Sequence, residues 1–330
     1  MSEIRIDPLT GDYIIVNDQR MNRPVIVSDN NTSKECPFCP ESTKRHPGLP
    51  LEYEALAVTN LYSSLELNPD LKKLKNEGSK KETLFISKPN IGKCEVLLYS
   101  SDHDLEFYDQ SKELTLKIMK LWKDRFVELQ EISLIKYIYI FENRGSGAGV
   151  TILHPHGQLY ALSFIPPIVK RQLKNTNKYF QEHDSCLMCD IIQKERNENQ
   201  RIILENNYFI AFVPYYAKML YEVHIAPLEH HESIIDMNMD ELKAFGSIIQ
   251  EVRRKYDSLF SSKKASFMMM LFNEPVNTNK KYNFHFYLQF VCLDKDEKNF
   301  KYRASVETGL QVWTNDVSPE KIAEEFKKKI

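Results

Sequence analysis

Three absences narrow what this 330-residue chain can be. It contains no run of about 18 apolar residues, the length needed to span a bilayer. Its opening, MSEIRIDPLTGDY, lacks the basic stretch followed by an apolar run that marks a secretory signal. Its net charge is only −2, so no polybasic field indicates nucleic acid or an anionic membrane as a partner. We therefore expect a cytoplasmic protein that binds neither, and that holds any phosphate-bearing ligand with a few well-placed groups.

Cysteine is scarce as well, and its arrangement is more informative than its number of six. One C-x-x-C motif occupies residues 36–39 and another occupies 186–189. In a reducing cytosol such pairs are metal ligands or redox pairs rather than structural disulfides. The two remaining thiols, Cys94 and Cys292, lie in strand-like apolar runs, where we expect them to be buried in the core.

The sequence does contain an internal repeat. Each half runs in the order C-x-x-C, strand, His, amphipathic helix with a 3.6-residue period, strand, and a strand that carries His. The elements expected in the first half are strands at 95–100, 135–143 and 151–162 and a helix at 111–129; those in the second are strands at 208–215, 222–227, 266–273 and 282–291 and a helix at 241–259. A polar stretch, KRQLKNTNKYFQEHD, leads from one half to the other, so we place the boundary near 165–185 and expect domains of 1–168 and 169–330.

Each half also supplies a set of two cysteines and two histidines, a common structural choice for tetrahedral zinc. The sets are Cys36, Cys39, His103 and His154 in the first half, and Cys186, Cys189, His230 and His285 in the second. Neither has the short spacing of a zinc finger, and a lone His is usually an ordinary surface or core residue. The parallel between the halves favours one zinc in each, with His231 left open as an alternative to His230.

The sharpest local motif is HPHGQ at 154–158. Residues two apart on a strand share a face, so His154, His156 and Gln158 are predicted to project together. Proline and glycine at the alternate positions are odd in a central strand unless a ligand or another backbone lies close. The preceding RGSGAG turn is a plausible cradle for phosphate oxygens.

His156 is therefore predicted to be a nucleophile that attacks phosphorus, since a neutral imidazole is available near pH 7. Gln158 can hold a phosphoryl oxygen but cannot give up a proton. This favours a leaving group that needs no proton, such as a sugar phosphate or pyrophosphate, and argues against simple hydrolysis.

HPHGQ, together with DPLTGDYIIVNDQRMNRP, CPFC, EVLLYSSDH and FENRGSGAG, resembles the galactose-1-phosphate uridylyltransferase family of the histidine-triad superfamily. The resemblance runs from about residue 7 to the C-terminus. It implies an α+β fold in which two histidine-triad-like repeats, with antiparallel sheets flanked by helices, form one body. It also implies a homodimer in which residues of the partner lie near the substrate.

The resemblance further implies a ping-pong reaction. UDP-glucose would give its uridylyl group to His156, and galactose 1-phosphate would then accept it from the uridylyl-His156 intermediate. By position, Gln158 would hold the phosphoryl group. The other residues expected near substrate are Arg20, Arg23, Asn143 and Thr151 at the phosphates, Phe38, Asn60 and Tyr62 at uridine, and Lys301, Glu307 and Gln311 toward the hexose.

The second half departs from the catalytic pattern, because 283–287 reads NFHFY and offers no nucleophile in the needed form. We expect His285 to be retained for metal, and zinc rather than iron because the set contains cysteine. Two alternatives stay open. One is a related nucleotidyltransferase or phosphorylase that acts on ADP-sugars, dinucleotides or another sugar 1-phosphate. The other is a zinc-stabilised nucleotide-binding protein without catalysis.

Overall fold

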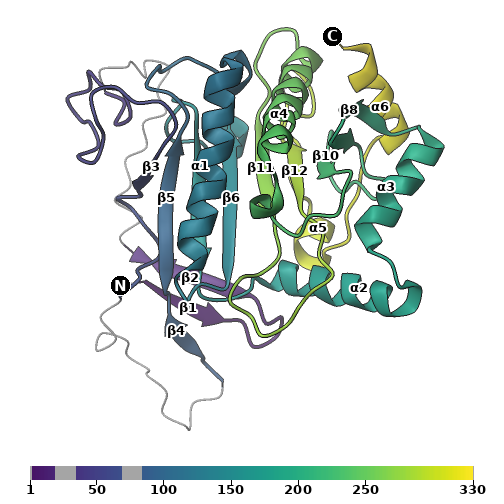
Figure 1. Ribbon diagram of the computed structural model, residues 1–330, viewed down its shortest axis with the longest axis horizontal. Helices are drawn as coiled ribbons and strands as arrows, with labels where there is room; N and C mark the ends of the chain where they lie inside the picture. The colour runs from purple at the N-terminus through teal and green to yellow at the C-terminus, as the bar shows by residue number, and fades with distance from the viewer. Residues whose placement is uncertain (1, 19–34, 69–83, 330) are drawn as a thin grey trace.

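The computed structural model describes residues 2–18, 35–68 and 84–329. At the centre of this part lies an antiparallel nine-stranded sheet (Figure 1). In spatial order its strands are β3 (Leu56–Thr59), β5 (Gly92–Leu98), β7 (His156–Leu162), β6 (Tyr137–Arg144), β11 (Phe267–Phe272), β12 (Tyr287–Cys292), β10 (Val223–Pro227), β9 (Phe209–Phe212) and β8 (Ile202–Glu205). A separate small sheet has the order β2 (Tyr13–Asn17), β1 (Ser2–Ile6) and β4 (Ser87–Pro89), and it was not predicted from the sequence.

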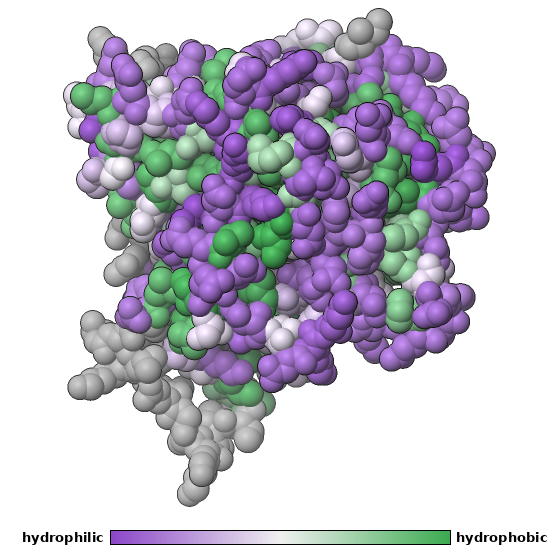
Figure 2. Space-filling model, in the orientation of Figure 1, coloured by the Kyte–Doolittle hydropathy of each residue, from purple (hydrophilic) through white to green (hydrophobic). Residues whose placement is uncertain are grey.

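Two long helices, α1 (Lys112–Gln130) and α4 (Met239–Leu259), lie side by side on one face of the large sheet (Figure 1). Ser111 caps α1 by accepting from the backbone N–H of Leu114, and Asn238 forms a capping box with Glu241 at the start of α4. Each helix turns an apolar stripe to the sheet and leaves a mainly hydrophilic outer surface, which Figure 2 shows. Both helices were predicted from that periodicity, to within two residues at their first turns.

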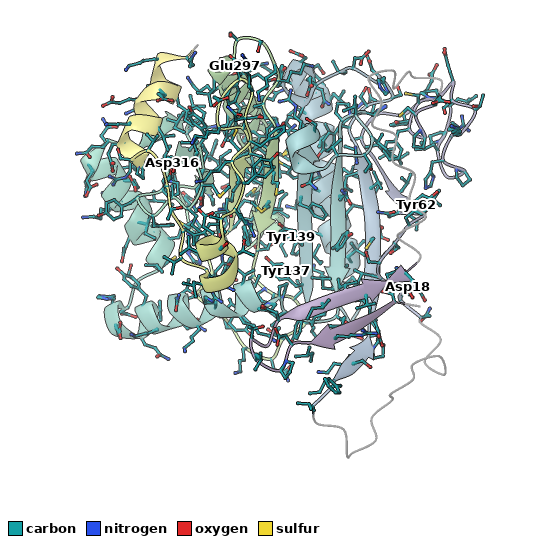
Figure 3. The ribbon with its side chains drawn as sticks, turned by 180° about the vertical axis from the view of Figure 1, so that it is seen from behind. Asp18, Tyr62, Tyr137, Tyr139, Glu297 and Asp316 are labelled. Carbon is teal, nitrogen blue, oxygen red and sulfur yellow. The ribbon has the colours of Figure 1, made fainter. Side chains whose placement is uncertain are left out.

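The opposite face of the sheet is covered by shorter elements (Figure 3). They include α2 (Pro167–His183), α3 (Leu187–Glu198) and α5 (Ser305–Leu310), whereas α6 (Pro319–Lys328) packs against α4 and β8. The polar stretch between the halves forms α2, which buries Val169 and Leu173 in a cluster that contains Tyr137 and Phe284. It is thus a packed helix of the body, and within the described residues no helix is long and apolar enough to cross a membrane.

The two repeats meet at equivalent strands, and this confirms the predicted α+β fold of two repeats in one body. Each repeat contributes strand, strand, helix, strand, strand in chain order, the second repeat adds β8 at the outer edge, and β6 of the first pairs with β11 of the second. One row of residues, paired from strand to strand, crosses the junction and is symmetric about it, so that residues equally far from the junction occupy equivalent positions in the two repeats. The row contains Val58, Val96, Gln158, Phe141, Met270, Gln289, His224 and Phe212. Phe141 and Met270 face each other across a pseudo-twofold axis.

Element boundaries differ from expectation mainly at the two strands that were predicted to carry histidine. The strand predicted at 282–291 begins only at Tyr287, and the His285 ring turns to the backbone carbonyl of Pro227. The strand predicted at 151–162 begins only at His156, because Pro155 has no N–H for a ladder and the His154 ring turns to the backbone carbonyl of Ser100. Residues 151–155 therefore form a connection and not a strand. The prediction for the two other cysteines is confirmed, since Cys94 and Cys292 are both buried.

Candidate active site and two candidate metal sites

Four side chains of the first repeat converge as the paired motifs predicted, namely Cys36, Cys39, His103 and His154. Their ligand atoms all lie within 4.8 Å of one another. Cys39 Sγ is 3.1 Å from His103 Nδ1 and 3.5 Å from His154 Nδ1. A tetrahedral zinc with bonds of about 2.0–2.3 Å would set such sulfur–nitrogen edges at roughly 3.6 Å. The donor set therefore fits a tetrahedral metal ion.

The chemistry of this cluster also calls for a cation. Burial raises the pKa of the Cys39 thiol to about 12, and the neighbouring Cys36 adds to the shift. Burial lowers the pKa of His154 to about 4, so its ring is neutral. Its Nε2 donates to the Ser100 carbonyl at 2.8 Å, which leaves Nδ1 to face the cysteines. A bound metal ion would stabilise the thiolates that this buried site otherwise disfavours.

The second repeat builds the same arrangement from Cys186, Cys189, His230 and His285. Cys189 Sγ lies 3.7 Å from His230 Nδ1 and 3.4 Å from His285 Nδ1. The Pro227 carbonyl accepts a hydrogen bond from Nε2 of His285 at 3.2 Å, as the Ser100 carbonyl does from His154 in the first repeat. His231 points elsewhere and bonds Glu241 at 2.7 Å, so it does not join the cluster.

His156 begins β7, beside the first cluster, and its orientation fixes its tautomer. Nδ1 lies 2.8 Å from the backbone carbonyl of His154. A carbonyl only accepts, so Nδ1 carries the proton and the neutral ring has its lone pair on Nε2. The Phe38 ring packs edge-on against this imidazole with centroids 5.2 Å apart. The ring nitrogen that keeps its lone pair is therefore determined by the same backbone segment that carries a candidate metal ligand.

Gly157 keeps the backbone of β7 close to the buried Tyr99. A Cβ on Gly157 would lie 2.4 Å from the hydroxyl oxygen of Tyr99, so only glycine fits here. Tyr99 is fully buried and donates its hydroxyl to Glu142 at 2.8 Å. The Pro and Gly of HPHGQ led us to expect a ligand or another backbone close to this strand, and the neighbour at Gly157 is instead the side chain of Tyr99. It fixes the backbone between His156 and Gln158.

A cavity of about 360 Å³ opens on one side of His156. Its apolar walls and few polar groups are typical of a small-ligand site. The lining includes Phe38, Asn60, Tyr62 and Gln158, which were expected at uridine and phosphate, and also Lys44, Arg45 and His46, which were not predicted. The KRH run that follows CPFCPEST was the available signal for these three, since it lies just after the predicted metal ligands Cys36 and Cys39.

A second cavity of about 300 Å³ lies on the other side of His156. Asn143 lines it, together with His103, Asp104 and the glycine-rich loop at Gly145. The unpredicted residues of this cavity include Glu106 and also Lys264 from the second repeat, which donates to Glu106 at 2.8 Å. His156 lines both cavities, so a ligand that spans them would carry its central group past Nε2.

Of the remaining expected residues, those that the structure describes line neither cavity beside His156. Thr151 lies between two cavity-lining neighbours but lines neither cavity itself. Lys301 lies 3.6 Å from Asp316, Glu307 accepts from the backbone of Ala304 and from Thr314, and Gln311 accepts from Arg171. Arg20 and Arg23 lie outside the described residues.

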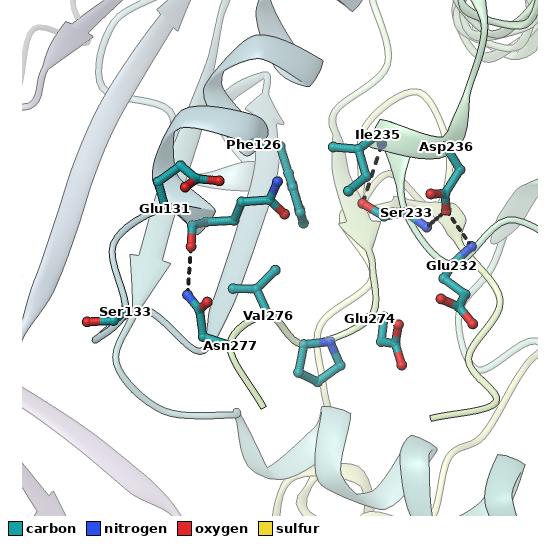
Figure 4. A pocket seen from close by; sticks show the side chains of 12 residues that line it. Phe126, Glu131, Ser133, Glu232, Ser233, Ile235, Asp236, Glu274, Val276 and Asn277 are labelled. Carbon is teal, nitrogen blue, oxygen red and sulfur yellow. Dashed lines mark hydrogen bonds between the residues drawn. The ribbon is translucent and has the colours of Figure 1, made fainter. Parts of the chain in front are cut away.

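A further hollow, of about 350 Å³, lies at the junction of the repeats (Figure 4). It lies between the end of α1 and the loop at 274–277, and its polar side chains include Glu131, Glu232, Asp236 and Glu274. Burial, with the nearby Glu232 carboxylate, raises the pKa of Glu274 to about 7. No cysteine or histidine is among its lining residues, so it lacks the donor types of the two metal clusters.

Comparison with known proteins agrees with this geometry. Residues 1–166 match the family model for the N-terminal domain of galactose-1-phosphate uridyl transferase, and residues 172–297 match the model for its C-terminal domain. A galactose-1-phosphate uridylyltransferase of Thermotoga maritima is 34% identical over 328 residues, which cover 99% of this chain and 98% of that protein. The Saccharomyces cerevisiae enzyme of the same name is 29% identical over 87% of this chain and 84% of its own length.

Solved structures give the same result. A uridylyltransferase structure superposes with a TM-score of 0.84 at 27% identity, covering 98% of this chain and 97% of the other. An ADP-glucose phosphorylase from Arabidopsis thaliana shares the fold, with a TM-score of 0.72 at 22% identity and 100% and 99% coverage. The residues, the repeat and the matches together show that this chain belongs to the galactose-1-phosphate uridylyltransferase family.

Proposed function

We propose that this protein exchanges a uridylyl group between UDP-glucose and galactose 1-phosphate through a covalent uridylyl-His156 intermediate. The observation that carries the proposal is the His156 imidazole, which lines two cavities and has its lone pair on Nε2 because Nδ1 donates to the His154 carbonyl. The 34% identity to the Thermotoga maritima galactose-1-phosphate uridylyltransferase over nearly the whole chain supports the choice of substrates.

The first half-reaction breaks one phosphorus–oxygen bond and forms one phosphorus–nitrogen bond. Nε2 of His156 attacks the α-phosphorus, and glucose 1-phosphate leaves with the bonding electron pair as an already ionised phosphate. The Nδ1 proton stays on the ring, hydrogen-bonded to the His154 carbonyl, which stabilises the positive charge that the imidazole gains. Galactose 1-phosphate reverses these steps with its own phosphate oxygen and releases UDP-galactose.

Phosphate recognition falls to residues on both sides of the nucleophile. Gln158 donates its amide to a phosphoryl oxygen, and its inability to supply a proton suits a leaving group that needs none. Asn143 approaches from the second cavity, and we place Arg20, Arg23 and Thr151 near the same phosphates. Lys44 and Arg45 add positive charge at the first cavity, where the nucleotide would enter.

The uridine lies in the first cavity in this proposal, between Phe38 and Tyr62. Asn60 presents a side-chain amide, and its Oδ1 is held by the backbone N–H of Tyr62 at 2.9 Å. That contact leaves the amide donors to read a uracil carbonyl. An ADP-sugar would place a larger base with a different donor pattern in the same space, which is the alternative that the experiment below separates.

The hexose side involves a second protomer in our proposal. Lys301, Glu307 and Gln311 line neither cavity of their own protomer, so we place them against the hexose bound to the partner in a homodimer. Sedimentation should then give a dimer. Lys301→Ala should raise the KM for galactose 1-phosphate and leave the formation of uridylyl-His156 unchanged.

We propose zinc at both clusters, because each offers two thiolates and two Nδ1 atoms at tetrahedral spacing. When bound, the metal supplies structural rigidity, and at the first site it would fix His154 and so the carbonyl that orients His156. We further propose residues 1–168 as the catalytic repeat and 169–330 as the non-catalytic one. A cytoplasmic, reducing setting would keep the four thiols free to bind metal.

Intact mass spectrometry tests the function directly. Wild-type protein incubated with UDP-glucose should gain one uridylyl group, which galactose 1-phosphate should remove, and the His156→Ala variant should gain none. An adenylyl adduct from ADP-glucose in place of the uridylyl adduct would transfer the proposal to the ADP-sugar alternative. No adduct with either nucleotide sugar would refute covalent catalysis by His156.

A further inference from the structure

The second repeat carries no nucleophile, but two ion pairs join its helix α4 to β6, the strand next to the active site. Arg253 binds Glu142 through two contacts of 3.0 and 2.6 Å. One turn further along α4, Asp257 binds Arg144 through two contacts of 2.6 and 2.7 Å. Glu142 and Arg144 are alternate residues of β6 and so share one face, while Arg253 and Asp257, four apart, share one face of the helix.

The order of the charges allows both ion pairs to form in only one register of β6 against α4. The strand presents acid then base, and the helix presents base then acid. Sliding β6 by two residues, the smallest shift that keeps the same face inward, would move each charge away from its bidentate partner. The four charges therefore fix the position of β6 along α4, in addition to holding the strand and the helix together.

Because the ion pair between Arg253 and Glu142 is buried, a gain in the free energy of unfolding does not by itself account for its presence. The side chains of Arg253 and Glu142 are 1% and 3% exposed. A buried ion pair often stabilises a protein no more than apolar side chains of the same volume would, whereas it can fix a unique arrangement. Arg253 also lies over the Phe107 ring at 4.3 Å, so its guanidinium is held on more than one side.

Both ion pairs lead to active-site groups. Glu142, Asn143 and Arg144 all line the second cavity beside His156, and Asn143 lies on the face of β6 opposite to the two charged residues. Glu142 also accepts the hydroxyl of Tyr99, whose oxygen lies directly behind Gly157. The chain of contacts Arg253, Glu142, Tyr99 thus ends at the backbone that joins His156 to Gln158.

Arg144 fixes the other end of the same stretch. It is the last residue of β6, and Gly145 follows it with a φ of +82°, opening the glycine-rich loop. Glu106, which lines the second cavity, also contacts the Arg144 guanidinium at 3.0 Å. Holding Arg144 through Asp257 therefore sets where the loop begins.

We propose that Arg253 and Asp257 of the non-catalytic repeat are positioning residues for uridylyl transfer, which place Asn143, the glycine-rich loop and the backbone of His156 through their ion pairs with Glu142 and Arg144. The inference rests on the proposed function. It assigns a role in catalysis to the repeat that holds no nucleophile.

The chain offers a matched control for this proposal. Arg201 forms another buried ion pair, with Glu195, with side chains 3% and 4% exposed and contacts of 2.9 and 3.1 Å. It lies in the second repeat and lines neither cavity beside His156. Arg201→Met removes a comparable buried charge and should disturb stability without disturbing position at the active site.

The test compares Arg253→Met, Arg253→Lys and Asp257→Asn with Arg201→Met in the full-length protein. The readout is the single-turnover rate of uridylyl-His156 formation at saturating UDP-glucose, per folded molecule, with thermal melting and metal content recorded for each variant. We expect Arg253→Met and Asp257→Asn to be slower by about 10- to 100-fold, because a misplacement of about 1 Å lowers rates on that scale. The KM for UDP-glucose should stay near that of the wild type, Arg253→Lys should recover part of the rate, and Arg201→Met should react at the wild-type rate.

A wild-type rate in both Arg253→Met and Asp257→Asn would overturn the proposal, and so would an equal loss in Arg201→Met. If Arg253→Met does not fold, Tyr99→Phe decides together with Asp257→Asn, because it removes one hydroxyl from the same chain of contacts and leaves the ring in place. Wild-type rates in those two would likewise overturn it. Failure of the wild-type protein to form any adduct would instead refute the proposed function, so the two failures are distinguishable.

Discussion

Replacing Gly157 by alanine tests how tightly the side chains behind the strand next to His156 are packed. The added Cβ would lie 2.4 Å from the hydroxyl oxygen of Tyr99, 3.2 Å from its Cζ and 3.5 Å from the carbonyl oxygen of Phe141. An ordinary contact needs about 1 Å more than the first of these, and Tyr99 cannot move easily because it is fully buried against Phe107 and bonded to Glu142. Overpacking of this size costs about 1–3 kcal/mol of unfolding free energy.

The same displacement should reach the chemistry, because Gly157 joins His156 to Gln158. A backbone shift of about 1 Å there is expected to slow uridylylation by about 100-fold. Urea unfolding gives the stability, and single-turnover mass spectrometry with UDP-glucose gives the rate. Adding Tyr99→Phe to Gly157→Ala should restore stability relative to Gly157→Ala alone, although Tyr99→Phe destabilises the wild type. A Gly157→Ala protein as stable and as fast as the wild type would refute the steric reasoning, as would a double variant no more stable than Gly157→Ala.

Three further outcomes follow from the structure. Cys186→Ser should release one metal ion per chain, lower the melting temperature and leave the uridylylation rate of the folded protein unchanged; loss of that rate with the fold intact would contradict a structural second site. Tyr62→Ala should raise the KM for UDP-glucose by about tenfold, since a lost aromatic contact is worth about 1–1.5 kcal/mol, and should spare the melting temperature because the ring is 42% exposed; an unchanged KM would place uridine elsewhere. Burial raises the pKa of Glu274 from its ordinary 4.5 to about 7, with the Glu232 carboxylate adding to the shift, so the folded state favours the proton and stability falls as pH rises from 4.5 to 7. Glu274→Gln should remove that fall and stabilise the protein at pH 8 by no more than about 1 kcal/mol, since the group is only partly buried; a pH–melting curve identical to that of the wild type would refute this assignment.

The parts of the fold that follow from periodicity could be predicted from the sequence. The stripes of α1 and α4 and the strand-like runs of the two sheet halves carry enough apolar residues at regular spacing to identify them. The repeat was visible because C-x-x-C and His recur in the same order, and that recurrence selected two metal sets that the structure brings together. Where the functional residues stood in a short motif, the local sequence was sufficient to predict that they belong to one site.

Other features could not be read because they depend on residues far apart in the chain. Arg253 and Glu142 are separated by 111 positions, and nothing local marks either of them as a partner. The edge strand β4 is three residues long and has no period to detect. The prediction that the HPHGQ strand begins at residue 151 was wrong, because tertiary contacts of His154 override the alternation that a strand would give.

Pairing between β6 and β11 also bears on how such a chain could arise. The two strands meet at equivalent positions, Phe141 opposite Met270, so the contact is self-complementary in the way that a twofold interface between identical subunits is. A single-repeat ancestor with this edge would have assembled by pairing the edge with a second copy. In our proposal only the first copy keeps a nucleophile, but the second copy still has to cover the exposed edge of the first, because an open β6 would be a site for aggregation. The duplication is therefore difficult to reverse, and the second repeat persists as a fixed subunit of its own chain.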